Sequence, residues 1–144
     1  MHLQEADEQF GVGSEKLKIK HIHRLRKLGL HNSTNARIEK LDRADYDFGI
    51  FSQNLFVEDA GMLDDCAFTE SFNGKIGKIS YSDGGLGFFS KGLCIDEWHR
   101  GVDFDLWASE NAKINKQISL GNADRNFHGT IYHRRIRNKR ATPF

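Results

Sequence analysis

The stretch that decides the predicted fold is Gly74-Lys75-Ile76-Gly77-Lys78-Ile79-Ser80-Tyr81-Ser82-Asp83-Gly84-Gly85-Leu86-Gly87-Phe88-Phe89-Ser90. Apolar residues at 76 and 79, and again at 86, 88 and 89, indicate two extended segments. Residues 82–85 between them hold two glycines, which accept positive φ, and Ser and Asp side chains that bond to their own backbone. The pattern predicts a β-hairpin, with a kink or bulge near Gly77.

Further strands are expected on both sides of this hairpin. Asn73-Gly74 is a strong hairpin turn, which makes residues 66–90 a meander. Alternating apolar and polar side chains predict strands at 46–51, 55–57, 102–106, 114–120 and 127–136. The fold class expected is therefore mainly β, an antiparallel barrel of about six strands.

The segment ahead of these strands is expected to be helical. Ser14 is a suitable N-cap, Ile22, Leu25 and Leu28 share one helix face, and Gly29 is a suitable end. These features predict a helix over residues 15–28, although the alternation from 17 to 25 also fits a strand. A second, short helix is expected at 36–41. Residues 1–13 predict a flexible N-terminal arm, and residues 14–140 a single domain.

Composition excludes several classes of protein. The chain has 144 residues, a net charge of +1 and 38% apolar residues, so it predicts one domain without a global attraction to nucleic acid or membrane. No apolar run approaches the length of a membrane span, and the acidic N-terminus is unlike a signal peptide. Cys66 and Cys94 lack metal-site spacing, which favours reduced thiols in a cytoplasmic protein. No cofactor, metal or catalytic residue is predicted.

The segment 68–136 resembles the PilZ domain family. Ser80-x-Ser82-x-x-Gly85, followed by Leu86-Gly87-Phe88, is similar to the family motif (Asp/Asn)-x-Ser-x-x-Gly and its apolar run. The resemblance implies a small β-barrel that binds cyclic di-GMP. This sequence departs from the family in having Ser80 at the first motif position and in lacking an Arg-x-x-x-Arg pair. A hydroxyl is a weaker partner for a guanine edge than a carboxylate.

Two versions of a PilZ-like binding module follow from the resemblance. In the first, cyclic di-GMP is held by Ser80, Ser82, Gly85 and by arginines, for which the candidates are Arg37, Arg43, Arg134 and Arg135. In the second, the nucleotide site has been lost, and the protein is an adaptor for a protein partner in bacterial motility or surface behaviour. Neither version is an enzyme.

Two basic clusters support an alternative of another class. Lys16, Lys18, Lys20, Arg24, Arg26 and Lys27 form the first cluster, and residues 134–140 form the second. Guanidinium groups bind phosphate bidentately, so the alternative is a nucleic-acid-binding protein. His128 and His133 beside the second cluster extend this alternative to a metal-free ribonuclease, in which histidines act as acid and base.

Overall fold

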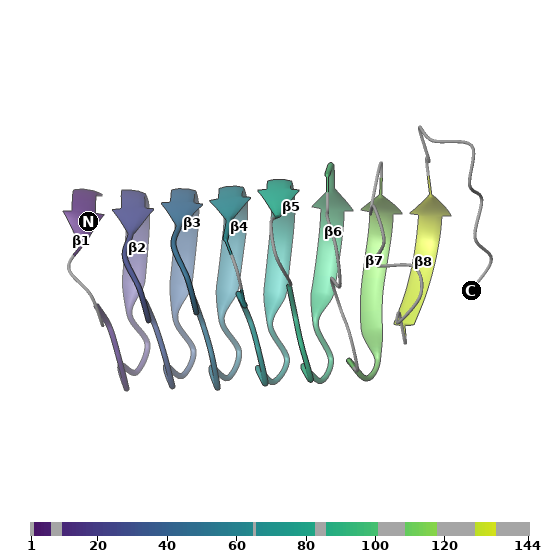
Figure 1. Ribbon diagram of the computed structural model, residues 1–144, viewed down its shortest axis with the longest axis horizontal. Helices are drawn as coiled ribbons and strands as arrows, with labels where there is room; N and C mark the ends of the chain where they lie inside the picture. Colours follow the sequence, from purple (N-terminus) through teal and green to yellow (C-terminus); the bar gives the residue numbers. More distant parts are fainter. Residues whose placement is uncertain are drawn as a thin grey trace.

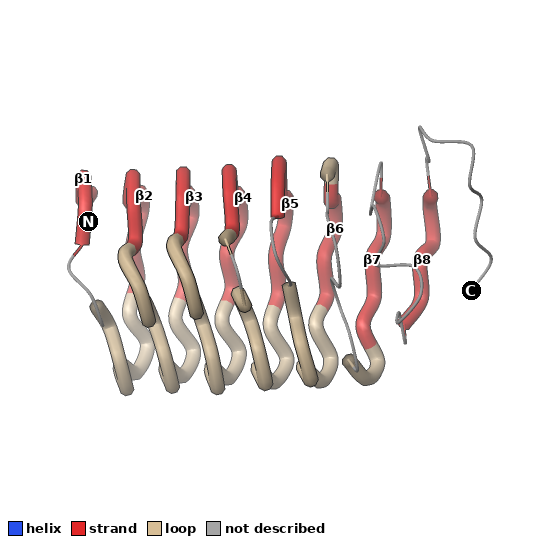
Figure 2. Tube along the Cα trace, viewed as in Figure 1, coloured by secondary structure: helices blue, strands red, loops and turns tan. Residues whose placement is uncertain are grey.

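The computed structural model describes residues 2–6, 10–64, 66–82, 86–100, 109–117 and 129–134. These residues form one sheet of eight parallel strands, which lie side by side in chain order (Figure 1). The strands are β1 (His2–Ala6), β2 (Lys18–Leu25), β3 (Arg37–Ala44), β4 (Phe56–Leu63), β5 (Lys75–Ser82), β6 (Cys94–Trp98), β7 (Ala112–Gln117) and β8 (Gly129–Arg134). Between strands the chain returns along one face of the sheet, as Figure 2 shows for the segments that precede β2 to β6. A strand with its return segment is one coil of a solenoid-like stack.

A constant offset relates each coil to the next. The register pairs Lys18 with Arg37, Arg37 with Phe56, and Phe56 with Lys75, so equivalent residues lie 19 positions apart. The return segments are joined by a second row of isolated parallel bridges with the same offset, at residues 15, 34, 53, 72, 91 and 110. Between β7 and β8 the offset is shorter, because Lys113 pairs with Thr130.

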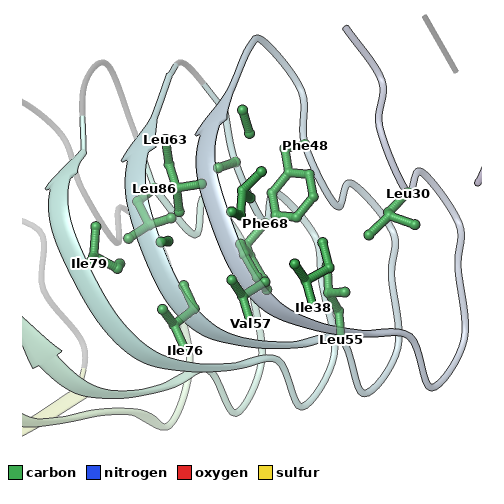
Figure 3. Close-up of a cluster of buried hydrophobic side chains, with 14 of the residues drawn as sticks. Leu30, Ile38, Phe48, Leu55, Val57, Leu63, Phe68, Ile76, Ile79 and Leu86 are labelled. Carbon is green, nitrogen blue, oxygen red and sulfur yellow. The ribbon is translucent and has the colours of Figure 1, made fainter. Parts of the chain in front are cut away.

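The core is built from rows of equivalent residues, one residue per coil. Within β2, β3, β4 and β5 every third residue is buried, as Ile19, Ile22 and Leu25 show for β2. The first row consists of Ile19, Ile38, Val57, Ile76, Ile95 and Ile114, which are at most 2% exposed. Figure 3 shows three of its members in consecutive coils, with the rings of Phe48 and Phe68 beside them. These two rings meet edge to face at 5.6 Å between centroids.

The return segments have their own repeated geometry. Five of them contain a serine whose backbone N–H bonds to the carbonyl three residues earlier, as Ser33 does to Leu30. The serine row comprises Ser14, Ser33, Ser52, Ser71, Ser90 and Ser109. Two residues later an asparagine commonly adopts positive φ, as at Asn35, Asn54, Asn73 and Asn111. Asn54 Nδ2 donates to Asn35 Oδ1 at 2.9 Å, so the asparagines also contact along the stack.

Core packing repeats every two coils. Two positions in each return segment form a large–small pair, and the order reverses from one coil to the next. The pairs are Gly11 with Leu17, Leu30 with Ala36, Gly49 with Leu55, Phe68 with Gly74, and Gly87 with Leu93. A Cβ on Gly49 would lie 2.8 Å from Leu55 Cδ2, and one on Gly74 would lie 2.9 Å from Phe68 Cδ1. In these two pairs the large side chain therefore occupies space that the glycine leaves open.

The predicted antiparallel barrel is wrong. Every strand pairing in the described part of the chain is parallel, and the strands form an open row. Strand β5 lies where the sequence predicts one, but the hairpin after it is also wrong. Ser82 N–H bonds to the carbonyl of Arg100 in the next coil, and Leu86 bridges to Ala67 in parallel. Asn73 lies at the end of a return segment, just before β5, and not in a hairpin turn. Residues 46–51 form a turn, where the sequence predicts a strand.

Both predicted helices are wrong, and no helix occurs among the described residues. Residues 15–28 contain β2, and residues 36–41 contain most of β3. Ile22, Leu25 and Leu28 follow one another at intervals of three residues, a spacing that an amphipathic helix also shows. This shared spacing explains why a helix is predicted at residues 15–28. The segment expected to be a flexible arm contains β1, which pairs with β2. No helix in the described ranges is long and apolar enough to cross a membrane.

The large–small pairing predicts the outcome of filling one glycine. Gly74→Ala should lower the free energy of unfolding by about 1–3 kcal/mol, because its Cβ would meet the ring of Phe68. In a Phe68→Leu background the same substitution should cost less, since the ring edge is absent. Urea unfolding of the four proteins measures the coupling, expected to be at least about 0.5 kcal/mol. Equal costs in both backgrounds would contradict the pairing.

Candidate functional site

The residues implied by the resemblance do not converge. Ser82 is 1% exposed inside the stack, where its hydroxyl accepts a hydrogen bond from Trp98 Nε1 at 3.1 Å. Ser80 is exposed on the same strand. Arg37 and Arg43 stand near opposite ends of β3, two strands away from β5. Their site is therefore not formed in the described part of the chain.

The remaining predicted residues lie elsewhere. Arg134 ends β8, five strands from β3 in the sheet. Gly85, Arg135 and most of the second basic cluster lie outside the described residues. The ribonuclease alternative depends on His128, which also lies outside them, and on His133 in β8.

The outward side of the sheet carries most of the described charges, and we call it the charged face, formed by the exposed and half-buried residues of β2 to β7. Its three arginines each contact an acid 21 residues later, which is two positions further along the next coil. Arg24 Nε and Nη2 both donate to Asp45, at 3.1 and 3.0 Å to Oδ2. Arg43 Nη2 donates to Asp64 at 2.9 Å, and Arg37 pairs with Glu58.

Asp45 and Asp64 hold Arg43 between them. Arg43 Nε lies 3.3 Å from Asp45 Oδ1, and its Nη2 lies 2.9 Å from Asp64 Oδ2. The hydrogen bond and charge of Asp64 raise the pKa of Arg43 above its usual value, with a smaller contribution from Asp45. Arg43 thereby joins the coils of β3 and β4, and Asp45, which also accepts from Arg24, extends this network to the coil of β2.

Two histidines converge on one carboxylate at the start of the charged face. His21 Nε2 and His23 Nδ1 lie 3.0 and 2.9 Å from the same oxygen, Asp42 Oδ2. Burial opposes ionisation of Asp42, but the hydrogen bonds from both histidines, with the charges of His21 and Lys40, outweigh it. The pKa of Asp42 is therefore lowered. Within the described ranges no group of three or more His, Cys, Asp or Glu residues is arranged to hold a metal.

An aromatic ring in β4 separates two cations. Arg37 Cζ lies 5.1 Å from the ring centroid of Phe56, and Lys75 Nζ lies 5.2 Å from it. These residues are neighbours in the register, so the three side chains form a cation–ring–cation row across β3, β4 and β5. Cation–π attraction stabilises the row by about 0.5–1 kcal/mol per contact at an exposed site. The row holds both cations at the surface of the sheet.

A cleft opens at the beginning of β2 and β3. Its volume is about 440 Å³, and it is lined by Lys18, Ile19, Lys20, Arg37 and Glu39. Lys18 and Lys20 are exposed, and they form no ion pair within the described part of the chain. Strand β1 pairs with residues 21–25 of β2 only, so no described strand covers this part of β2. The cleft is therefore an exposed group of cations with a single carboxylate, Glu39.

A scan against models of known protein families found no match, and neither curated proteins nor solved structures showed a significant similarity.

The sequence contains a repeat that indicates the fold, but single segments do not show it. Ser-x-Asn recurs at residues 33–35, 52–54, 71–73 and 109–111, each time at the same point of a coil. Self-similarity at a fixed period is typical of repeat architectures. Once the period of 19 is known, it places Lys18 and Arg37 side by side and Ser82 in the same inward row as Leu25, Ala44 and Leu63. The period of 19 residues therefore accounts for both the cleft and the burial of Ser82.

The position of Ser82 predicts a structural role. Ser82→Ala should lower the free energy of unfolding by about 1–3 kcal/mol, because the buried Trp98 indole loses its acceptor. Ser80→Ala is the matched control on the exposed side of β5 and should leave stability within about 0.5 kcal/mol. Urea unfolding of both variants tests this, and a neutral Ser82→Ala variant would contradict it.

The lowered pKa of Asp42 predicts a specific acid sensitivity. A carboxylate with a folded-state pKa below its unfolded value of 3.8 stabilises the fold above that value. This contribution is lost as the pH falls through the folded-state pKa. Asp42→Asn should therefore be less stable than the parent at neutral pH, with a smaller loss of stability on acidification below about pH 4. Urea unfolding across this pH range measures the difference.

His21→Ala/His23→Ala removes both hydrogen-bond donors and should flatten the same part of the profile. If the profiles of both variants ran parallel to that of the parent, the histidines would not be the cause.

Proposed function

We propose that the protein is a non-enzymatic binding module whose charged face holds an acidic polymer. The observation that supports this most directly is the cleft with Lys18 and Lys20 exposed beside Arg37. Elsewhere on the charged face, Arg24 and Arg43 are occupied by carboxylates of the next coils. Lys18 and Lys20 form no ion pair within the described ranges, although Glu39 lines the same cleft, so their charge is available to an external anion.

The chemistry of the cleft favours recognition of a carboxylate, sulfate or phosphate group. Lys is a compact cation with three donors, and Arg37, whose guanidinium also pairs with Glu58, adds further positive charge beside them. Glu39 in the same cleft accepts hydrogen bonds, which suits a ligand that carries hydroxyl or amide donors beside its anionic group. A cleft lined mainly by one sign of charge also raises the local concentration of an oppositely charged chain.

Cyclic di-GMP binding stays a prediction from the resemblance to PilZ domains. The volume of the cleft, about 440 Å³, lies in the range of small-molecule sites. Its cations could meet the phosphates, but Ser80 and Ser82 are not part of it. Calorimetric titration with cyclic di-GMP tests this prediction. Binding that is lost in a Lys20→Glu variant would place the nucleotide in the cleft. An adaptor for an acidic protein partner would use the same cations.

The polymer proposal predicts salt-dependent binding that requires the cleft. Fluorescent dextran sulfate should bind, with an affinity that falls linearly with the logarithm of salt concentration. Lys18→Glu/Lys20→Glu should weaken binding at least about tenfold, equivalent to 1.4 kcal/mol, and should reduce the salt slope. Lys27→Glu/Lys91→Glu is the matched control, because it makes the same change in net charge at exposed lysines outside the cleft.

Anisotropy titrations at several salt concentrations measure both quantities. Equal losses in the two double variants would mean that only net charge matters. Absence of binding by the parent protein would overturn the proposal.

A further inference from the structure

From β3 to β7, pairs of exposed cations on the charged face recur every second coil. Strands β3, β5 and β7 each present two cations three residues apart, and we call these pairs the basic rungs. They are Arg37 with Lys40, Lys75 with Lys78, and Lys113 with Lys116. All six side chains are exposed. The period of the basic rungs is thus 38 residues, twice the period of the coil.

The intervening strands carry carboxylates beside the second cation of each rung, whereas Phe56 and Cys94 lie beside the first. The acidic rungs are Glu58 with Asp59 on β4 and Asp96 with Glu97 on β6, and all four residues are half-buried. The register puts Lys40 opposite Asp59, Asp59 opposite Lys78, Lys78 opposite Glu97 and Glu97 opposite Lys116. At this position the charged face therefore alternates in sign from strand to strand between β3 and β7.

The alternation fixes a distance. Adjacent strands of a sheet lie about 4.8 Å apart, so the basic rungs repeat about every 9.6 Å along the stack. The alternation is in phase with the two-coil packing of the core. The described coils of β3 and β5 hold the Gly–Leu pairs at 49/55 and 87/93, whereas the coil of β4 holds Phe68 with Gly74. The two kinds of coil thus differ in their interiors as well as in their surfaces.

An alternating face discriminates between polyanions. A chain with an anionic group on every unit, such as a nucleic acid or a polyuronate, would place some of its charges over the acidic rungs, where like charges repel. A polysaccharide with one carboxylate per disaccharide repeats over a distance close to two strand spacings. Its carboxylates could each meet a basic rung, and its neutral sugars could donate hydroxyl hydrogen bonds to the acidic rungs.

We infer that the charged face selects an acidic polysaccharide with one anionic group per disaccharide, lying along the stack across β3, β5 and β7. This inference rests on the proposed function and specifies its ligand. Each basic rung alone would bind weakly, as exposed ion pairs do. Three rungs in line act on one chain, so the second and third contacts form within an existing complex and the affinity multiplies.

The test compares three polyanions at equal concentration of charge and physiological salt. Hyaluronan oligosaccharides carry one carboxylate per disaccharide, polygalacturonate carries one on every sugar, and poly(U) carries a phosphate on every nucleotide. We expect hyaluronan to bind at least tenfold more tightly than either of the others. Lys75→Glu/Lys78→Glu removes the central rung and should weaken hyaluronan binding at least tenfold. The control Lys27→Glu/Lys91→Glu should weaken it less, since neither lysine belongs to a rung.

The acidic rungs supply the second arm of the test. Asp59→Asn/Glu97→Gln removes one carboxylate from each acidic rung, so the preference for hyaluronan should fall and binding of polygalacturonate and poly(U) should rise. Circular dichroism and thermal unfolding of each variant separate loss of binding from loss of fold. Equal or tighter binding of poly(U) or polygalacturonate by the parent would overturn this inference and leave the proposed function standing. Failure of all three polyanions and of dextran sulfate would overturn both.

Discussion

The constant register between coils is the constraint on which the rest of the structure depends. Because every residue lies beside its equivalent at about 4.8 Å, a residue type repeated along the chain becomes a continuous row. Rows tolerate conformations that single residues avoid. Leu30 and Phe68 adopt positive φ, which costs a non-glycine residue roughly 1 kcal/mol. Backbone hydrogen bonds to the neighbouring coils hold both in place, from Leu30 N to Phe10 O and from Phe68 N to Phe48 O.

The same register makes surface charge a structural problem. Rows of like charge at this spacing would repel, and the chain limits the repulsion by diagonal ion pairs and, between β3 and β7, by a row that alternates in sign from Lys40 to Lys116. A slip by one coil would place Lys40 beside Lys78 and Asp59 beside Glu97, so the charges also specify the stacking order. The cleft lies where this compensation is incomplete, at Lys18 and Lys20.

Local patterns in the sequence predict the mainly β class and strand β5, but they do not predict topology. A strand buried at every third residue shows the same apolar spacing as a helix face, which is why residues 15–28 were predicted to be helical. Turn residues such as Asn73 predict that the chain turns and not whether the next strand runs parallel. Arg37 lies in the cleft and is exposed, whereas Arg43 is held by two carboxylates. Each arginine pairs with an acid 21 residues later, Glu58 or Asp64, which only the period of the coil brings close, and Arg43 differs by its second contact, with Asp45.

The unit of this structure is two coils, because the core pairs and the charged rungs both repeat over 38 residues. Each added unit extends the rows at a fixed spacing without changing the contacts already made. A site of this kind has no centre, since no rung is more buried or better shaped than the next. Its affinity arises only for a partner that repeats at the same interval, because each matched contact then forms within the complex made by the others. The ligand specificity inferred for the charged face therefore depends on the repeat spacing of its charges, and not on a single pocket or catalytic cluster.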